Sequence, residues 1–175
     1  TYLSNQRKFD EASTYATTLL NSIDIERLDN FEQQRRETRN LVEQIRSVAS
    51  QDYSYPLFSG PTFVLTLATT LRYATNLGMP QLALTLTDSV TQACDTLGPD
   101  HPHTLASCNN LACAYQTAGR LEEAITLHEQ NLEETTHTHI SNPGTLTGSN
   151  KLARTYLTAG RFQEAIALFE YNLDS

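Results

Sequence analysis

Four of the five histidines form two His-x-His pairs that could bind a metal. His101 and His103 form one pair, and His137 and His139 form the other. A zinc site needs four protein ligands, or three and a water, together with residues that orient them. Neither pair has a cysteine or carboxylate at a spacing that would complete such a set, so we expect no bound metal. His101 instead precedes Pro102, where it would cap or pack against the start of a helix.

The three cysteines, Cys94, Cys108 and Cys113, are candidate nucleophiles. Their number is odd and no two have CxxC spacing, which favours free thiols in a reducing compartment. A catalytic thiol needs a lowered pKa and a histidine close by. Cys108 falls on the packing stripe of a predicted helix, and Cys113 falls toward the opposite side. We therefore interpret the cysteines as small helical residues.

Motifs of nucleotide and metalloprotease chemistry are absent from the sequence, which has no GxxxxGKS/T, GxGxxG or HExxH. The carboxylate pairs Glu122–Glu123 and Glu133–Glu134 lie near the two ends of one predicted helix, where solvent would surround them. The sequence therefore predicts a protein that is not an enzyme and that needs no cofactor.

The charge of the chain argues against nucleic acid as a partner. The 175 residues carry a net charge of -8, whereas phosphate binding needs a basic patch. The densest basic cluster, Arg35, Arg36 and Arg39, has acidic residues on both sides and reads as a solvated helix face. No run of 18 apolar residues predicts a transmembrane helix, and no signal-peptide pattern opens the chain. We expect a cytoplasmic protein that binds no membrane.

The second half of the sequence repeats with a period of 41 residues. "TAGRLEEAITL" begins at Thr117, and "TAGRFQEAIAL" begins at Thr158. Four sets of identical residues keep the spacing across three copies: Pro61, Pro102 and Pro143; Gly78, Gly119 and Gly160; Ala83, Ala124 and Ala165; Leu86, Leu127 and Leu168. A fixed period in this range predicts a solenoid, in which each unit buries its apolar face against its neighbours.

Each copy reads as a pair of helices. Proline suits the first helical position because its missing N–H would be unpaired there, and Asn142 before Pro143 is a suitable N-cap. Gly119 and Gly160 would end the first helices, since glycine tolerates a left-handed cap. The second helices share one apolar stripe: Leu121, Ala124, Ile125, His128 and Leu132 in copy two, and Phe162, Ala165, Ile166, Phe169 and Leu173 in copy three.

These residues resemble a tetratricopeptide repeat. The pattern L-A-x-x-Y…G…A…F is present as Leu152, Ala153, Tyr156, Gly160, Ala165 and Phe169. The linker "LGPDHPHTL" (97–105) followed by "NNLA" (109–112) is similar to the longer, roughly 42-residue repeats of the kinesin light chain type, which also occur in bacterial regulators. The resemblance implies an all-α fold, a right-handed solenoid of antiparallel helix hairpins. Ten arginines against two lysines favour a bacterial source.

The copies are not uniform, and this bears on the predicted domains. We expect repeats at 61–101, 102–142 and 143–175, after degenerate repeat-like helices and a loop at 1–60. Copy one has Ala74 where the pattern has tyrosine, copy two has His128 for the aromatic residue, and copy three has Lys151 for the second asparagine of "NNLA". Because the chain starts at Thr1 without methionine, we expect it to be a fragment of a longer protein.

The first 60 residues are less regular. "TYLSNQRKFDEA" (1–12) echoes "TYLTAGRFQEA" and reads as the end of an earlier repeat. Residues 29–50 read as a long helix with five apolar side chains turned inward: Phe31, Leu41, Val42, Ile45 and Val48. The loop at 51–61 carries Tyr53, Tyr55 and Phe58, which would plug a joint between helices or anchor a partner.

The resemblance also implies a binding face. In this family the first helices line a concave groove, and residues around the "LA" pair contact the ligand. Carried over position by position, these are Asn109, Asn110, Cys113 and Gln116 in copy two, and Asn150, Lys151, Arg154 and Thr158 in copy three. Asparagine suits a peptide backbone because it both donates and accepts hydrogen bonds, and Lys151 with Arg154 would favour an acidic segment.

Two functions fit this prediction. The first is a non-catalytic module that binds a protein or peptide in the groove. The second is the regulatory or sensor repeat domain of a larger signalling ATPase or transcriptional regulator, binding other domains of its own chain. An upstream P-loop domain in the full gene would favour the second function.

Overall fold

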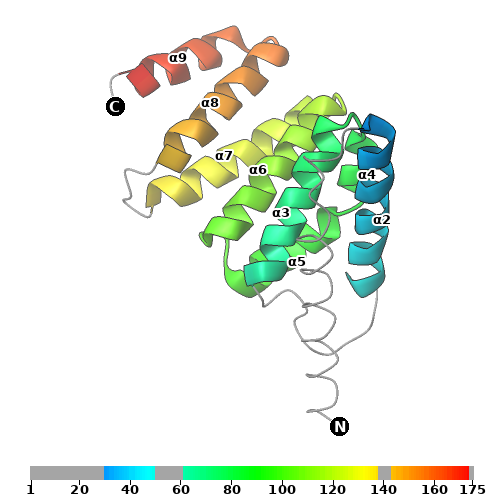
Figure 1. Ribbon diagram of the computed structural model, residues 1–175. Helices are drawn as coiled ribbons and strands as arrows, with labels where there is room; N and C mark the ends of the chain where they lie inside the picture. The colour runs from blue at the N-terminus through cyan, green and yellow to red at the C-terminus, as the bar shows by residue number, and fades with distance from the viewer. Residues whose placement is uncertain (1–29, 50–60, 138–142, 174–175) are drawn as a thin grey trace.

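The computed structural model describes residues 30–49, 61–137 and 143–173, and all regular structure in these ranges is helical (Figure 1). The helices are α2 (Phe31–Ala49), α3 (Pro61–Asn76), α4 (Pro80–Leu84), α5 (Thr87–Leu97), α6 (Pro102–Thr117), α7 (Leu121–His137), α8 (Pro143–Thr158) and α9 (Phe162–Leu173). The N-terminal residues that echo a repeat and the aromatic loop at 51–60 lie outside the described residues.

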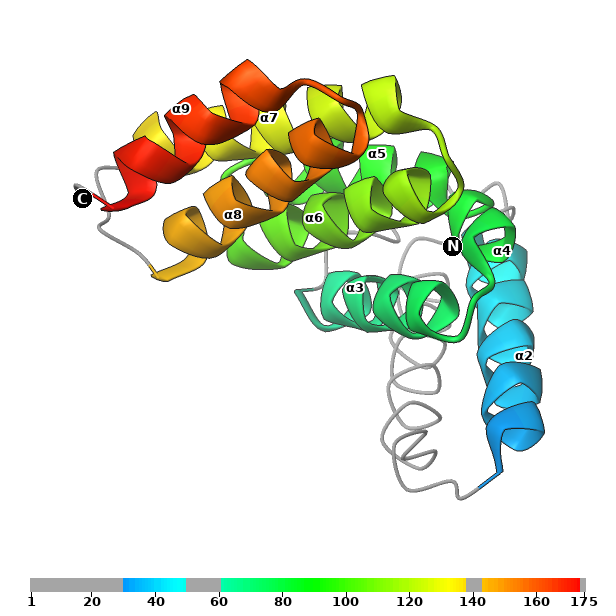
Figure 2. The ribbon, with the colours of Figure 1, turned by 90° about the horizontal axis from the view of Figure 1, so that it is seen from above.

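Consecutive helices pack against one another to form the stack. α6 packs on α7, α7 on α8, and α8 on α9, and α2 closes the stack against α3. In the view of Figure 2, α7 and α9 lie above α6 and α8. We call the packing of α3 on α6 the first joint, and the packing of α8 on the α6–α7 pair the second joint.

Proline and glycine mark the ends of the first helices. Pro61, Pro102 and Pro143 each begin a helix, where the missing N–H costs no hydrogen bond. Gly119 and Gly160 follow α6 and α8 with φ of 79° and 77°, in the left-handed region that favours glycine. The glycine caps that the sequence predicts are therefore confirmed.

The turn "GR" between paired helices is held in the same way in two copies. The Arg120 N–H donates to the Tyr115 carbonyl at 2.9 Å, which is the Schellman closure of a helix C-terminus. The Arg120 guanidinium lies 4.7 Å from the ring centre of Tyr115 and pairs with Glu123 at 2.6 Å. Arg161, Tyr156 and Glu164 repeat this arrangement. The repeated sequence therefore gives both turns the same stabilising contacts.

His101 is the N-cap of α6. Its Nδ1 accepts a hydrogen bond from the His103 N–H at 3.2 Å, and the two rings lie 5.3 Å apart. The predicted capping role is confirmed, because this nitrogen satisfies one of the N–H groups that a helix start leaves unpaired. The proposed cap at Asn142 and the histidine at position 139 fall outside the described residues.

The second helix of copy one is interrupted, which the sequence analysis did not predict. α4 ends at Leu84, and α5 begins at Thr87. The Thr85 hydroxyl donates to the Leu82 carbonyl at 2.7 Å, and the Thr87 hydroxyl donates to the Leu84 carbonyl at 2.8 Å. These side chains compete for carbonyls that a continuous helix would use. Copy two has no such break, and it carries His128 in place of Thr87.

The main core lies at the first joint. Leu41, Val42 and Ile45 of α2 are buried as predicted, and they pack with α3, α5 and α6. Phe31 was also predicted to point inward, but it is 51% exposed. It occupies the first turn of α2, and burial on that helix begins only two turns later. The side chain of Val48 is outside the described set.

A smaller core lies at the second joint. Ile125 of α7 packs there with Leu152 and Tyr156 of α8 and with Ala165 of α9. Copy two buries Ala124, Ile125 and His128 of its predicted stripe. In copy three Ala165 is buried, but Phe162, Ile166 and Leu173 are exposed, so the predicted stripe is wrong at these positions, because α9 packs mainly on α8.

Candidate functional site

The eight residues predicted to contact a ligand lie on α6 and α8, and we call them the α6–α8 face: Asn109, Asn110, Cys113, Gln116, Asn150, Lys151, Arg154 and Thr158. On α6 all four are half-buried, while the opposite side of the helix is closed by Leu111 and Ala114. On α8, Lys151 is half-buried and the other three are exposed.

One hydrogen bond brings the two halves of this face together. The Gln116 amide of α6 donates to the Thr158 hydroxyl of α8 at 3.2 Å, and that hydroxyl donates to the Arg154 carbonyl at 2.9 Å. Both copies therefore contribute to one polar surface at the C-terminal ends of their first helices.

The asparagines of the face differ in what they contact. The Asn110 amide donates to the Ala68 carbonyl of α3 at 2.8 Å, so its N–H group joins two helices. The Asn150 oxygen accepts from the Asn172 amide of α9 at 3.2 Å. The Oδ1 of Asn109 is covered and has no hydrogen-bond partner in the part of the chain that the structure describes. Asn109 is thus the one of these three whose side chain is not used to hold helices together.

The charges around α8 are divided between its two sides. Lys151 and Arg154 supply positive charge on the α6–α8 face. The Tyr156 hydroxyl, on the buried side, donates to the Glu129 carboxylate of α7. Burial and this hydrogen bond raise the pKa of Tyr156 to about 12. The phenol therefore keeps its proton and the bond to α7 at neutral pH.

His128 is a buried residue whose importance the sequence analysis missed. It is 2% exposed, and both ring nitrogens lack a hydrogen-bond partner among the described residues. Burial, and then the charge of Lys151, lowers the pKa of His128 to about 4. The ring is therefore neutral at pH 7 and fills an aromatic position of the stripe. The sequence signal for this residue was that a histidine stands where the repeat pattern has an aromatic residue.

Two cysteines also come together. The Sγ atoms of Cys94 on α5 and Cys108 on α6 are 3.6 Å apart. The hydrogen bond from Cys108 lowers the pKa of the Cys94 thiol, and the same bond together with burial raises the pKa of Cys108. Their separation of 14 residues matches no motif, so only the folding of α5 onto α6 reveals the pair. Cys113 is half-buried and also a free thiol.

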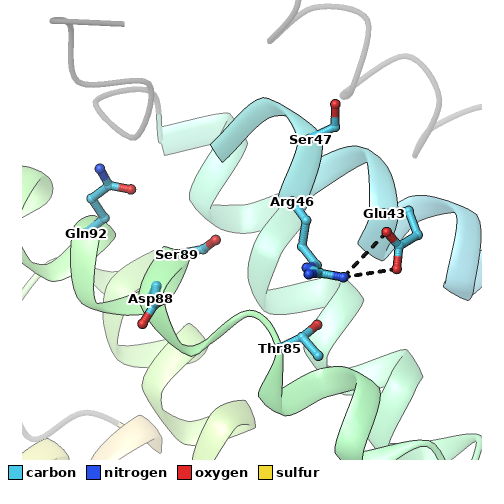
Figure 3. Close-up of a pocket in the computed structure, with 7 residues that line it drawn as sticks. All are labelled: Glu43, Arg46, Ser47, Thr85, Asp88, Ser89 and Gln92. Atoms are coloured by element: carbon cyan, nitrogen blue, oxygen red, sulfur yellow. Dashed lines mark hydrogen bonds and ion pairs between the residues drawn. The ribbon is translucent and has the colours of Figure 1, made fainter. Parts of the chain in front are cut away.

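A polar hollow of about 450 Å³ lies between α2 and the broken second helix of copy one (Figure 3). Arg46 reaches into it and is paired with Glu43 at 3.2 Å. Asp88 is the other charged residue of its lining, which also includes Ser47, Thr85, Ser89 and Gln92. The lining has no histidine or cysteine, and its arginine is paired with Glu43.

Residues 30–49, 61–137 and 143–173 hold no group of three or more histidine, cysteine, aspartate or glutamate side chains arranged to bind a metal ion. The helices of the same ranges include none that is both long and apolar enough to cross a membrane.

These helical hairpins, with a capped turn and a repeated packing stripe, define a helical-repeat solenoid. The sequence profile of the tetratricopeptide repeat matches residues 66–133 and 118–170. The chain therefore belongs to the tetratricopeptide repeat family, and the predicted all-α solenoid is confirmed.

Solved structures agree with this assignment. The chain is similar to a Podosopora anserina protein whose description names kinesin light chain and nearly identical TPR-like repeats, with 25% identity and a TM-score of 0.62. The match covers 97% of this chain and 85% of that one. A single-substitution variant of that protein matches at 24% identity with the same coverage and TM-score. No curated protein matches the chain.

Proposed function

We propose that this chain is a non-catalytic protein-binding module that holds an acidic peptide segment on the α6–α8 face. Tetratricopeptide repeats mediate protein–protein interaction, and the proposal assigns that role to particular residues. The observation that carries it is the Gln116–Thr158 hydrogen bond, because it joins the polar residues of two copies into one surface.

The chemistry of this face suits a peptide. The Gln116 side chain can donate to and accept from a peptide backbone, whatever its sequence. Lys151 and Arg154 add two positive charges within a chain of net charge -8. A carboxylate placed beside Arg154 would gain a charge-assisted hydrogen bond, which is stronger than a neutral one.

The proposal is tested with immobilised peptides of equal length that are acidic, neutral or basic. The acidic set should be retained best, and the double variant Lys151→Ala, Arg154→Ala should lose about tenfold in affinity, or roughly 1.4 kcal/mol. Arg36→Ala is the matched control, since Arg36 is an exposed arginine on α2. Preferred capture of basic peptides, or equal loss in the control, would contradict the proposal.

Domain boundaries and location belong to the same proposal. We assign the binding module to residues 61–175, with copies at 61–101, 102–142 and 143–175, and a degenerate N-terminal unit at 1–60. Helix starts at Pro61, Pro102 and Pro143 support this division. We place the module in the cytoplasm, where unpaired thiols are kept reduced.

A further inference from the structure

We propose that Cys94 and Cys108 form a reversible disulfide under peroxide, which staples the second helix of copy one to the first helix of copy two. The two Sγ atoms are 3.6 Å apart and lie on helices that pack against each other. A disulfide needs an S–S distance of about 2.05 Å, so the sulfurs must approach by only about 1.5 Å.

The chain between the two cysteines can accommodate this approach. Cys94 lies in the last turn of α5, and that helix is capped by Gly98, whose φ is 92°. A short linker then leads to the His101 cap of α6. The end of α5 is therefore joined to α6 by a turn, and a small shift of its last turn leaves the cap in place.

An oxidant can reach the pair through a hollow. A mainly apolar hollow of about 450 Å³ lies between α5, α6 and α7, and both cysteines line it together with Val90, Leu111, Tyr115 and Leu127. Cys94 is half-buried, whereas Cys108 is 8% exposed. Cys94 is thus the thiol that meets a small solute first.

The two sulfurs have different roles in the reaction. The thiolate is the reactive form, and the Cys108 S–H bond stabilises it at Cys94. The Cys94 thiolate attacks one oxygen of hydrogen peroxide, and the O–O bond breaks to give sulfenic acid and, after protonation, water. The Cys108 sulfur then attacks the Cys94 sulfur, and hydroxide leaves with the Cys108 proton as a second water. Two thiols and one peroxide become one disulfide and two waters.

The third cysteine supplies a control within the same chain. Cys113 follows Cys108 by five residues on α6, which places it about 140° around the helix. It is half-buried and does not line the hollow between α5, α6 and α7. Oxidation that is directed by the fold will therefore leave the Cys113 thiol available.

The test uses the whole purified chain, treated with a small molar excess of hydrogen peroxide and then with iodoacetamide. Intact mass should show one carbamidomethyl group instead of three, and dithiothreitol should restore three. Cleavage before Asp95 and Asp100 separates Cys94 from Cys108, so the bridge appears as two peptides that remain joined. The melting temperature should rise by roughly 5 °C or more, because a short loop is closed in the unfolded chain.

Single variants decide which thiols are paired. Cys113→Ser should still form the bridge, while Cys94→Ser should keep its remaining thiols open to alkylation, with far-ultraviolet circular dichroism checking that each variant folds. The proposal is overturned if peroxide-treated protein keeps three reactive thiols, if Cys94 stops at a sulfinic acid, or if the bridge includes Cys113 or a second molecule.

Discussion

The first and second joints occupy the same place in successive repeats, yet they are built differently. At the first joint, the Ser107 hydroxyl donates to the Val64 carbonyl at 3.3 Å, and the Asn110 amide donates to the Ala68 carbonyl at 2.8 Å. These bonds hold α6 along α3 over one of the most extensive helix contacts in the described structure. Side chains of copy two are thus fixed directly to the backbone of copy one.

The second joint lacks both of these residues. One period later, Gly148 replaces Ser107 and Lys151 replaces Asn110. In the described helices, α8 packs mainly on α7 and has slight contact with α6, where the Gln116–Thr158 bond joins side chains. The repeat period thus recurs in the helices, whereas the polar positions that differ between copies change the hydrogen bonds that cross each joint.

The largest expected loss of stability comes from shortening a buried leucine to alanine in either core. Leu67→Ala at the first joint should cost about 3 to 4 kcal/mol, because a fully buried leucine leaves a cavity in the larger cluster. Leu152→Ala at the second joint should cost about 2 to 3 kcal/mol, since the smaller cluster can relax more readily. Urea unfolding measures both values. A larger loss of stability for Leu152→Ala would show that the second joint contributes more to stability than the first.

Acid should destabilise the fold through His128 of α7. The pKa of folded His128 is about 4, below the ordinary value of about 6.5, so the unfolded chain binds the proton more readily. Stability from this residue is complete above pH 6.5 and is lost as pH falls toward 4, by about 2 kcal/mol at pH 5.

His128→Phe provides the control for this acid effect. The variant should remove that part of the pH dependence and gain about 1 kcal/mol at pH 7, because two unpartnered buried nitrogens are replaced by ring carbons. Urea unfolding at pH 7 and pH 5 measures both the gain in stability and the change in its pH dependence. Equal losses in the parent and in His128→Phe would show that another group senses the acid.

The inter-repeat asparagine should matter at the first joint and be transferable to the second. Asn110→Ala removes the bond to the Ala68 carbonyl and should cost about 1 kcal/mol. Lys151→Asn installs the same residue one period later, and an amide hydrogen bond across the second joint should give a gain of about 0.5 kcal/mol. Thermal unfolding, compared with the parent chain, shows whether Asn110→Ala lowers the melting temperature and Lys151→Asn raises it. Destabilisation by Lys151→Asn would mean that α8 lies too far from α6 for the transfer.

The smallest effect should come from the exposed link between α6 and α8. Gln116→Ala breaks the bond to the Thr158 hydroxyl, and we expect a loss below about 0.5 kcal/mol, because water can replace it. Peptide binding should fall more than stability does, since Gln116 belongs to the α6–α8 face. Thr117→Ala, on a neighbouring exposed hydroxyl of α6, is the matched control.

Much of the fold could be predicted from the sequence because its signals are local. Pro102 begins α6 and Gly119 ends its turn for reasons that involve only the adjacent backbone. The break between α4 and α5 is also local, but threonine is compatible with an intact helix as well, so Thr85 and Thr87 gave no decisive sign. Phe31 has the same helical spacing as the buried residues of α2. That spacing does not reveal at which turn the packing against other helices begins.

The candidate site could be predicted only as a set of positions. Asn109 and Asn110 are adjacent and chemically identical, yet one side chain joins α6 to α3 and the other does not. This distinction depends on the rotation of α6 against its neighbour, which the period does not specify. The approach of Cys94 to Cys108 likewise depends on how the end of α5 settles on α6.

The hydrogen bond from Tyr156 to Glu129 gives the second joint an optical signature. The protein has no tryptophan, so tyrosine dominates its near-ultraviolet absorbance. A free phenol ionises near pH 10, whereas burial and Glu129 raise the pKa of Tyr156 to about 12. A late step in phenolate absorbance during an alkaline titration would therefore report that α8 is still seated on α7, without any added dye.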